Sequence, residues 1–317
     1  MEEGGPKVRA VVAGEEDAGQ RLDNFLFRTL KGVPKSHIYR LLRTGQVRVN
    51  KKRAKPDYRL ESGDELRLPP VRQEQKVDAG KPPHWQQEAM RAGILYEDDR
   101  ILVVNKPAGM AVHGGSGVSF GVIETLRVLR PESPGLELAH RLDRDTSGCL
   151  IVAKRRSAVR PLHAAFREGS VEKHYLALLA HRWDGGAREV DAPLEKNQVE
   201  GGERIVKVSR DGKEAKSLFT PLQRVTDSVL SDVRIYTGRT HQIRVHASYI
   251  GHPVAGDHKY GDREANKIFK TAGLTRMFLH AHRLSFPHPE TGERLSLMAP
   301  LDDELQTVIR DLGGKSV

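Results

Sequence analysis

Residues 139–148, Ala-His-Arg-Leu-Asp-Arg-Asp-Thr-Ser-Gly, place one carboxylate in a distinctive setting. Asp143 lies in a short polar segment that runs directly into five apolar residues, Cys149-Leu150-Ile151-Val152-Ala153. An apolar run of this length, bounded by turn-forming residues, predicts a buried strand. We therefore expect the Asp143 loop at the rim of a sheet, where catalytic groups are often found. The residues alone also fit a simple turn, in which Asp and Ser side chains bond to their own backbone.

Further charged and aromatic side chains occur in two later segments, Glu172-Lys173-His174-Tyr175-Leu176-Ala177 and Thr237-Gly238-Arg239-Thr240-His241-Gln242-Ile243-Arg244-Val245-His246. The first segment begins a predicted strand. From Thr240 the second predicts a helix with an apolar stripe at Ile243, Ala247 and Ile250 and a cap at Gly251. Arg244 borders that stripe, where an arginine normally needs a carboxylate partner. By themselves, Tyr175 suits an ordinary strand aromatic and Arg244 a structural ion pair.

The positive charge of the chain is concentrated near its N-terminus. The whole chain has a formal net charge of +10 at pH 7. Residues 21–60 contain twelve Lys or Arg and two acids, Asp23 and Asp57, and so account for the entire excess. A compact basic block beside a balanced remainder is typical of a nucleic-acid contact, whereas a solvated charged face usually mixes both signs. Aromatic residues are scarce in the block, which argues against base stacking as its main mode of binding.

Two short helices and a strand pair are predicted within this basic block. The apolar residues from Leu22 to Thr29 repeat at helical spacing. Ser36 is the expected N-cap of a second helix that stops at Gly45. Residues 47–50 alternate like a strand, with residues 66–68 as a candidate partner. Eight basic residues fall on or beside the outward faces of these elements: Lys35, Arg40, Arg43, Arg48, Lys51, Lys52, Arg53 and Lys55.

The rest of the chain predicts a linker followed by a mixed α+β body. Residues 71–92 are largely polar and include Pro82 and Pro83, so they are not expected to bury enough apolar surface to fold alone. The body is predicted to contain hairpin strands at 94–96 and 101–104, helices at 120–129 and 158–166, and strands at 174–179, 217–219, 232–236 and 278–286. Strands outnumber helices and do not alternate regularly with them, which favours an α+β fold over a parallel α/β fold.

Composition narrows the class of protein. The single cysteine, Cys149, permits no intramolecular disulfide, and its place in the predicted strand makes it a small core residue. A reducing cytoplasm is the natural compartment for such a chain. No apolar run is long enough to cross a bilayer, and the N-terminal residues lack the basic start and apolar stretch of a secretory signal. We expect a cytoplasmic protein without a membrane partner.

The segment His140-Arg141-Leu142-Asp143, followed by Thr146-Ser147-Gly148, resembles the catalytic motif of the RluA-type RNA pseudouridine synthases. Residues 105–109, 172–177 and 237–246 resemble further motifs of that family in the same order, so that the resemblance covers nearly the whole chain. Residues 19–70 resemble an S4 RNA-binding domain. The implied organisation is an N-terminal tail (1–18), an S4-like domain (19–70), a linker (71–92) and a catalytic domain with a mixed, mainly antiparallel sheet (93–317).

The resemblance also implies roles for individual residues. Asp143 matches the essential carboxylate of these synthases, Tyr175 a tyrosine that lies against the target base, and Arg244 a basic residue paired with the aspartate. Because the target uridine must be flipped out of folded RNA, Arg141 is expected to fill the space that it leaves. Arg239 is expected to hold a phosphate. The exposed basic residues of the S4-like domain would grip the RNA backbone: Lys35, Arg40, Arg43, Arg48, Lys51, Lys52 and Arg53.

The implied reaction converts uridine to pseudouridine, breaking the N1–C1′ bond and joining C1′ to C5 without net redox change. It therefore needs no metal, nicotinamide or nucleotide cofactor. Asp143 must be ionised to act as nucleophile or to stabilise positive charge at C1′, and a cationic Arg244 beside it would favour that form. Tyr175 is expected to stack on the detached uracil and help the closing proton transfer. The implied partner is large-subunit ribosomal RNA, free or in an assembling subunit, and the enzyme is expected to be a monomer.

Other interpretations were weighed against this one. His241 and His246 suggest a zinc site, but a chain with one cysteine has no Cys pair to complete it. Asp143-Arg144-Asp145 also fits a metal-dependent glycosyltransferase, which would require a divalent ion. The alternative from another class is a catalytically silent RNA-binding ribosome-assembly factor on the same fold. The joint presence of Asp143, Tyr175 and Arg244 argues against it.

Overall fold

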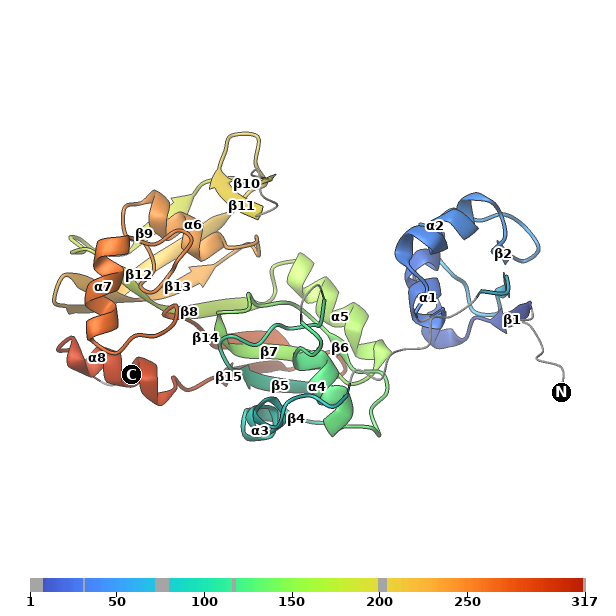
Figure 1. Ribbon diagram of the computed structural model, residues 1–317, viewed down its shortest axis with the longest axis horizontal. Helices are drawn as coiled ribbons and strands as arrows, with labels where there is room; N and C mark the ends of the chain where they lie inside the picture. Colours follow the sequence, from blue (N-terminus) through green and yellow to red (C-terminus); the bar gives the residue numbers. More distant parts are fainter. Residues whose placement is uncertain (1–7, 31, 72–79, 116–117, 199–203, 316–317) are drawn as a thin grey trace. The chain divides into compact units, whose positions relative to one another are not determined.

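The computed structural model describes residues 8–30, 32–71, 80–115, 118–198 and 204–315. These residues form two compact units, one ending at Gly80 and the other beginning at Lys81 (Figure 1). The division falls inside the predicted linker, of which residues 72–79 lie outside the described part of the chain. Each unit is described by itself.

The N-terminal unit packs two helices beside a three-stranded antiparallel sheet of order β1-β3-β2. The predicted helices and strand pair are confirmed. Leu22, Phe25, Leu26, Ile38 and Leu41 are all buried in one core cluster, because they recur on the inner face of each helix. The elements are β1 (Arg9–Val12), a 3-10 turn (Glu15–Asp17), α1 (Leu22–Thr29), α2 (Lys35–Arg43), β2 (Arg48–Val49) and β3 (Glu65–Leu68).

Two expectations for this unit were wrong. Ser36 is not an N-cap, because α2 already begins at Lys35, and the carbonyl of Pro34 accepts the first backbone hydrogen bonds of the helix. Residues 9–12, expected within a tail, form β1 and pair with β3. The strand is mostly exposed, so its sequence carries no alternating apolar signal, and backbone hydrogen bonds to β3 hold it in place.

The C-terminal unit is built on a ten-stranded sheet of order β4-β5-β7-β14-β8-β13-β12-β9, with β15 paired to β14 and β6 to β7. Among the described residues, β7 and β14 are parallel and the other pairs of this sheet are antiparallel. The predicted mixed, mainly antiparallel sheet is therefore confirmed. Its strands are β4 (Ile94–Glu97), β5 (Ile101–Lys106), β6 (Glu137–Leu138), β7 (Ser147–Ala153), β8 (Glu172–Ala180), β9 (Arg188–Asp191), β12 (Lys216–Val225), β13 (Ser228–Ile235), β14 (Leu279–Pro287) and β15 (Arg294–Met298).

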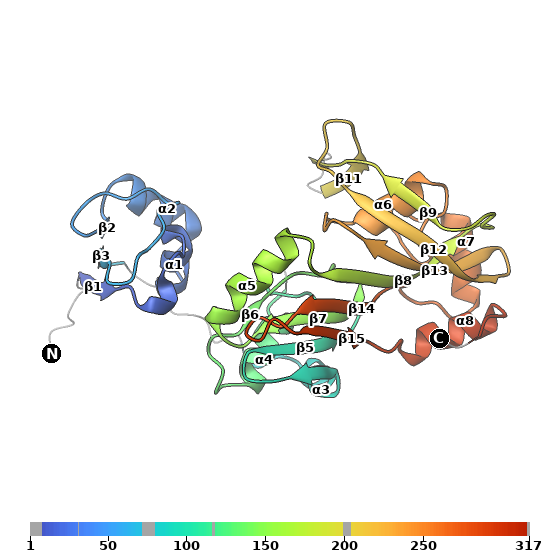
Figure 2. The ribbon, with the colours of Figure 1, turned by 180° about the vertical axis from the view of Figure 1, so that it is seen from behind.

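Helices cover both faces of this sheet, and a separate hairpin extends from it (Figures 1 and 2). In β8, Leu176 and Leu178 pack with α7 and α8, whereas Ala177 and Leu179 pack with α6. Burial on both faces explains why β7 and β8 have near-continuous apolar sequences. The helices are α3 (His84–Ala92), α4 (Val122–Leu129), α5 (Arg156–Arg167), α6 (Gln242–Tyr249), α7 (Arg263–Thr271) and α8 (Asp303–Asp311), and the hairpin is β10 (Leu194–Gln198) with β11 (Arg204–Val208).

The linker prediction was wrong for residues 84–92. These residues form α3, which begins after Pro83 and buries Met90 against Leu102 and Val104 of β5 and against α4. Only Gln86 and Met90 of this helix are buried, so its apolar stripe is too thin to recognise in the sequence. Cys149 is buried within β7, as predicted. In the described ranges, none of the helices combines the length and apolar character needed to span a membrane.

Candidate active site

The Asp143 loop connects the antiparallel strands β6 and β7, at the rim of the sheet as the sequence predicted. The backbone N–H of Ala139 donates to the carbonyl of Ile151 at 3.1 Å, and the N–H of Ile151 donates to Nε2 of His140 at 3.0 Å. His140 thus extends the strand pairing with its side chain. Its ring also stacks on Phe166 of α5, with 4.8 Å between centroids. Burial and the nearby positive charge of Lys173 lower the pKa of His140 to about 3, so the ring stays neutral and can accept this bond.

Gly148 allows the strand that follows the loop to approach β14. The parallel pairing of β7 with β14 places Gly148 opposite Ala281. A Cβ added to Gly148 would lie 2.3 Å from the carbonyl oxygen of Ala281, and the residue has φ +110°, a conformation that side-chain-bearing residues rarely adopt. Glycine is therefore required for β7 to pack here beneath the loop.

A buried lysine ties the loop to the segment at residues 105–109. The side chain of Lys106 is fully buried, and its ammonium donates to the carbonyls of Pro107, Met110 and Arg144 at 2.8–3.0 Å. The Nε of Arg144 donates in return to the carbonyl of Gly109 at 2.9 Å. Burial lowers the pKa of Lys106 to about 7, against the opposing charges of Asp145 and Asp143. These bonds fix the backbone immediately after Asp143.

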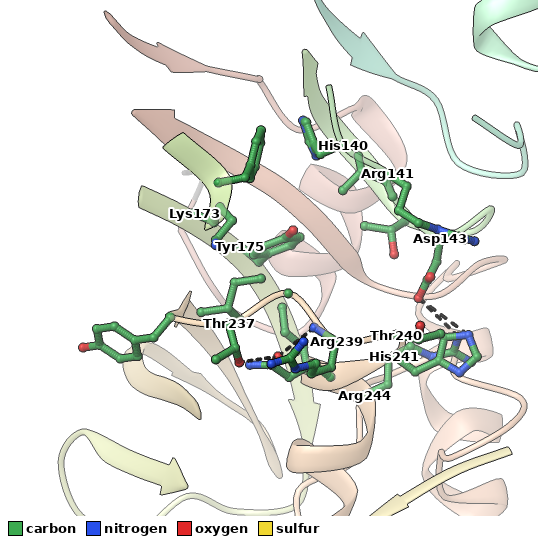
Figure 3. A pocket seen from close by; sticks show the side chains of 18 of the residues that line it. His140, Arg141, Asp143, Lys173, Tyr175, Thr237, Arg239, Thr240, His241 and Arg244 are labelled. Atoms are coloured by element: carbon green, nitrogen blue, oxygen red, sulfur yellow. Dashed lines mark hydrogen bonds and ion pairs between the residues drawn. The ribbon is translucent and has the colours of Figure 1, made fainter. Parts of the chain in front are cut away.

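Asp143 faces a cavity of about 660 Å³ that is lined by the loop, β8, the end of α5 and residues 235–244 (Figure 3). The Asp143 side chain is 22% exposed, so it is open to the cavity. Tyr175, Arg244, Arg141 and Arg239 line the same cavity. Five candidate residues from three separate sequence segments thus meet in one site, whose size suits a small-molecule or nucleotide ligand.

Arg244 lies between two carboxylates. Its Nε and Nη2 donate to Oδ2 and Oδ1 of Asp257 at 2.7 and 2.8 Å, and its Nη1 lies 3.8 Å from Oδ2 of Asp143. Burial disfavours the Arg244 cation, but hydrogen bonds and charge from Asp257 outweigh this and raise its pKa above the ordinary value. Asp257 is itself buried, and the same bonds hold its pKa low despite burial. The pair therefore presents a fixed positive group to Asp143.

His241 is a second neighbour of Asp143 that the sequence interpretation did not include. Its Nε2 lies 3.8 Å from Oδ2 of Asp143, and its Nδ1 is 2.9 Å from the hydroxyl of Tyr260. Burial and Arg244 lower the pKa of His241, whereas Asp143 opposes that shift. His241 has a left-handed conformation, which costs a non-glycine residue on the order of 1 kcal/mol. The sequence had suggested His241 only as a possible zinc ligand.

The helix that carries Arg244 begins two residues later than predicted. The side chain of Gln242 accepts from the N–H of Arg239 and the hydroxyl of Thr237, and it donates to the carbonyl of Lys216 and the hydroxyl of Ser217. These four bonds hold residues 237–241 as a turn along the cavity wall, so that α6 starts only at Gln242. Its predicted apolar stripe and its cap at Gly251 are as expected, with φ +83° at the glycine.

Tyr175 lies where the two halves of the sheet meet, since it contacts the cores on both sides. Burial and the charge of Asp143 raise the pKa of its hydroxyl well above the ordinary value, so Tyr175 remains a neutral phenol. Arg141 and Arg239 are both exposed at the cavity. Arg239 donates to the carbonyl of Glu214, whereas the guanidinium of Arg141 has no partner within the described part of the chain.

The seven basic residues proposed from the S4-like segment belong to the other unit. All seven are exposed, and none forms an ion pair with a described residue. Arg48 donates to the backbone carbonyl of Lys51, and Lys35 lies over the ring of Phe27. This unit therefore presents unneutralised positive charge: Lys35, Arg40, Arg43, Arg48, Lys51, Lys52 and Arg53.

Comparison with known proteins identifies the family to which this chain belongs. Residues 100–249, which include the Asp143 loop, Tyr175 and Arg244, match the family model of RNA pseudouridylate synthases, and residues 20–66 match the S4 domain. The chain is 55% identical to the ribosomal large subunit pseudouridine synthase C of Escherichia coli K12, with 97% of both chains covered. The chain belongs to the RNA pseudouridylate synthase family. It is therefore an isomerase with an N-terminal S4 domain, as the sequence indicated.

Other relatives of this synthase extend the comparison. The enzyme of the same name from Haemophilus ducreyi is 52% identical, with 96% of both chains covered. Among solved structures, the human RNA pseudouridylate synthase domain containing 4 protein is 28% identical, with a TM-score of 0.60, and matches 72% of this chain and 95% of its own. The structure of the human protein named RNA pseudouridylate synthase domain containing 1 is also 28% identical in sequence. Its TM-score is 0.59, and the match covers 72% of this chain and 90% of its own. These matches confirm the fold of the synthase.

Proposed function

We propose that this synthase converts uridines to pseudouridine in large-subunit ribosomal RNA, with Asp143 as the reacting carboxylate. Large-subunit RNA is proposed as the substrate because the chain is 55% identical to ribosomal large subunit pseudouridine synthase C of Escherichia coli, with 97% of both chains covered. The observation that supports the residue is its setting: Asp143 faces the cavity with Arg244 and His241 each 3.8 Å from one of its oxygens. Arg244 places a positive charge beside this carboxylate, and His241 places a ring nitrogen there.

Each of the candidate residues in the cavity has a separate role in this reaction. Asp143 attacks the nucleotide or stabilises positive charge at C1′ as the N1–C1′ bond breaks. Arg244, held by Asp257, places a positive charge 3.8 Å from the carboxylate and keeps it aligned. Tyr175 lies against the uracil and helps the closing proton transfer. Arg141 fills the space that the flipped uridine leaves, and Arg239 holds a phosphate. Because the reaction is an isomerisation without net redox change, no cofactor is needed.

The N-terminal unit supplies affinity for RNA. Its exposed lysines and arginines contact phosphates and so bind RNA structure more than sequence. The substrate is large-subunit RNA, free or in an assembling subunit. The enzyme acts as a cytoplasmic monomer without a membrane partner.

A tritium-release assay tests this function. Joining C5 to C1′ displaces the hydrogen on C5, so large-subunit RNA carrying C5-tritiated uridine should release tritium when the pure protein turns over. Release should continue with a chelator present, and small-subunit RNA should release far less. Dependence on a divalent ion would favour a metal-dependent glycosyltransferase. RNA binding without any release would favour a silent assembly factor.

A further inference from the structure

Lys173 is a buried cation in the active-site cavity whose charge nothing in the described chain balances. The residue is 8% exposed and lines the same cavity as Asp143 and Tyr175. Its ammonium has no hydrogen bond or ion pair with a described residue, and its close contact is the face of the Phe166 ring, 6.0 Å away. Burial lowers the pKa of Lys173, with no opposing carboxylate. An unpaired buried charge is costly to keep.

Two other enclosed lysines of this unit show what Lys173 lacks. The ammonium of Lys106 donates to three backbone carbonyls, and that of Lys154 lies 2.9 Å from a carboxylate oxygen of Glu97. Those two lysines are satisfied by the fold itself. Lys173 is left with free donors directed at the cavity, which is the arrangement expected of a group whose partner is a ligand.

The position of Lys173 indicates which part of the substrate it meets. Lys173 and Tyr175 are two residues apart in β8, so their side chains share one face at a spacing of about 6.6 Å. In Figure 3, Lys173 lies beyond Tyr175 as seen from Asp143. A uracil against Tyr175, with its sugar at Asp143, would direct an edge toward Lys173. A backbone phosphate would stay near the exposed Arg141 and Arg239.

We propose that Lys173 binds a carbonyl oxygen of the flipped uracil and stabilises the negative charge that develops on the ring during the reaction. When the N1–C1′ bond breaks, both electrons stay on the uracil, and the charge is shared between N1, O2 and O4. The ring then bonds to C1′ through C5, the C5 proton leaves, and N1 gains a proton. The sequence of steps conserves electrons and protons. A hydrogen bond from an ammonium to O2 or O4 is strongest in the charged state, so it would lower the barrier.

This proposal rests on the proposed function, and substrate-atom replacement tests it. Three RNAs would carry uridine, 2-thiouridine or 4-thiouridine at the target position, because sulfur accepts hydrogen bonds more weakly than oxygen. Single-turnover rates at saturating RNA would be measured for the wild type and for Lys173→Met. The wild type should be slowed roughly tenfold or more by one thio substitution, as expected for a bond to a charged donor. Turnover of ordinary RNA by the wild type separately tests the proposed function.

In Lys173→Met the rate on ordinary RNA should fall by about 10²–10³, the scale of losing one preorganised donor. The thio substitution that slows the wild type should not lower the rate of Lys173→Met any further, because this variant lacks the hydrogen bond from Lys173 to the uracil. RNA affinity should stay within about twofold. Lys154→Met is the matched control, since it removes a lysine that pairs with Glu97 outside the cavity, and it should keep the wild-type response to sulfur. Lys173→Arg retains the charge and should recover part of the rate.

Three results would overturn the proposal. Equal thio effects in the wild type and Lys173→Met would show that Lys173 does not contact either oxygen. A loss of RNA affinity without a loss of rate would indicate a phosphate contact. The third concerns stability: replacing an unpaired buried cation by an apolar side chain should leave the protein as resistant to denaturant or more so. Marked destabilisation of Lys173→Met would reveal a structural role instead.

Discussion

At the residue scale, the site depends on how charges are fixed around Asp143. Asp257 accepts hydrogen bonds from Nε and Nη2 of Arg244, and the remaining nitrogen, Nη1, faces Asp143. The buried carboxylate of Asp257 thus orients the guanidinium of Arg244 toward Asp143. The family resemblance identified Asp143, Tyr175 and Arg244 from their motifs. It did not identify Asp257, which lies thirteen residues after Arg244 on a separate turn, because no sequence spacing predicts that approach. His241 was overlooked because its role depends on the turn at 237–241.

Replacing Asp143 with Asn tests the reacting group. The amide keeps the size of the side chain and most of its hydrogen bonds but removes the charge, so tritium release should fall by at least about a thousandfold. The dissociation constant for RNA should change by less than about twofold. Asp145→Asn is the control, since Asp145 is a neighbouring exposed carboxylate that does not line the cavity. Near-normal turnover by pure Asp143→Asn would rule out the assignment.

Arg244→Met and Asp257→Asn should separate charge from alignment. Arg244→Met removes the cation beside Asp143, so the rate should fall by about 10²–10³. Asp257→Asn keeps the cation but weakens its clamp, and a misplaced group of this kind costs up to about a hundredfold. Single-turnover rates of both variants at saturating RNA are the measurement. If Asp257→Asn has the wild-type rate, the hydrogen bonds from Arg244 to Asp257 have no part in catalysis.

At the element scale, the sequence predicted helices and strands best where most of their side chains are buried. The apolar runs of β5, β7 and β8 predicted strands because both of their faces are buried. The strand β1, which is mostly exposed, gave no such pattern and was missed for that reason. The strand β15 was also missed, although Leu295 and Leu297 alternate with polar residues and pack against the core. The helix α3 was taken for a linker because it buries only two side chains. The late start of α6 arises from the bonds of Gln242, which no helix signal encodes.

The anchoring of the Asp143 loop by neutral His140 predicts a pH dependence of stability. The ordinary pKa of histidine is near 6.5, and that of His140 in the folded protein is about 3. Between these values the unfolded state binds a proton that the folded state does not, so acidification favours unfolding. His140→Gln should remove up to about 1.4 kcal/mol per pH unit from the slope of the free energy of unfolding against pH.

Urea denaturation between pH 7 and pH 4 measures this slope. Both tryptophans, Trp85 and Trp183, lie in the C-terminal unit, so their fluorescence reports on the unit that contains the loop. His163→Gln is the control, because His163 is exposed on α5. Parallel stability curves for the wild type and His140→Gln would show that His140 is not held neutral.

The basic surface of the N-terminal unit predicts how salt affects binding. Changing Arg43, Lys51, Lys52 and Arg53 to Gln should lower the slope of log affinity against log salt by up to about 3, at roughly 0.7–0.9 per phosphate contact. The rate at saturating RNA should change little, because Asp143 belongs to the other unit. Neutralising four exposed residues of α7 and α8 is the control: Arg263, Lys267, Lys270 and Arg310. An unchanged slope in the first variant would mean that this surface does not meet RNA.

At the scale of the whole molecule, the excess positive charge and the candidate active site lie in different units. Residues 21–60 carry the net charge of the chain, whereas Asp143, Tyr175 and Arg244 occupy a cavity of the C-terminal unit. The sequence predicted this division from charge distribution and motifs. The cavity itself could not be predicted in this way, because it forms where the Asp143 loop, β8 and residues 235–244, which are far apart in the chain, come together.

The most direct test of this account is a map of pseudouridine across large-subunit ribosomal RNA in cells that lack the protein. Particular uridines should remain unmodified in these cells. The wild-type gene should restore pseudouridine at those positions, and the Asp143→Asn variant, expressed at the same level, should not. Restoration by Asp143→Asn, or an unchanged map in cells without the protein, would contradict the central claim that this chain modifies large-subunit RNA through Asp143.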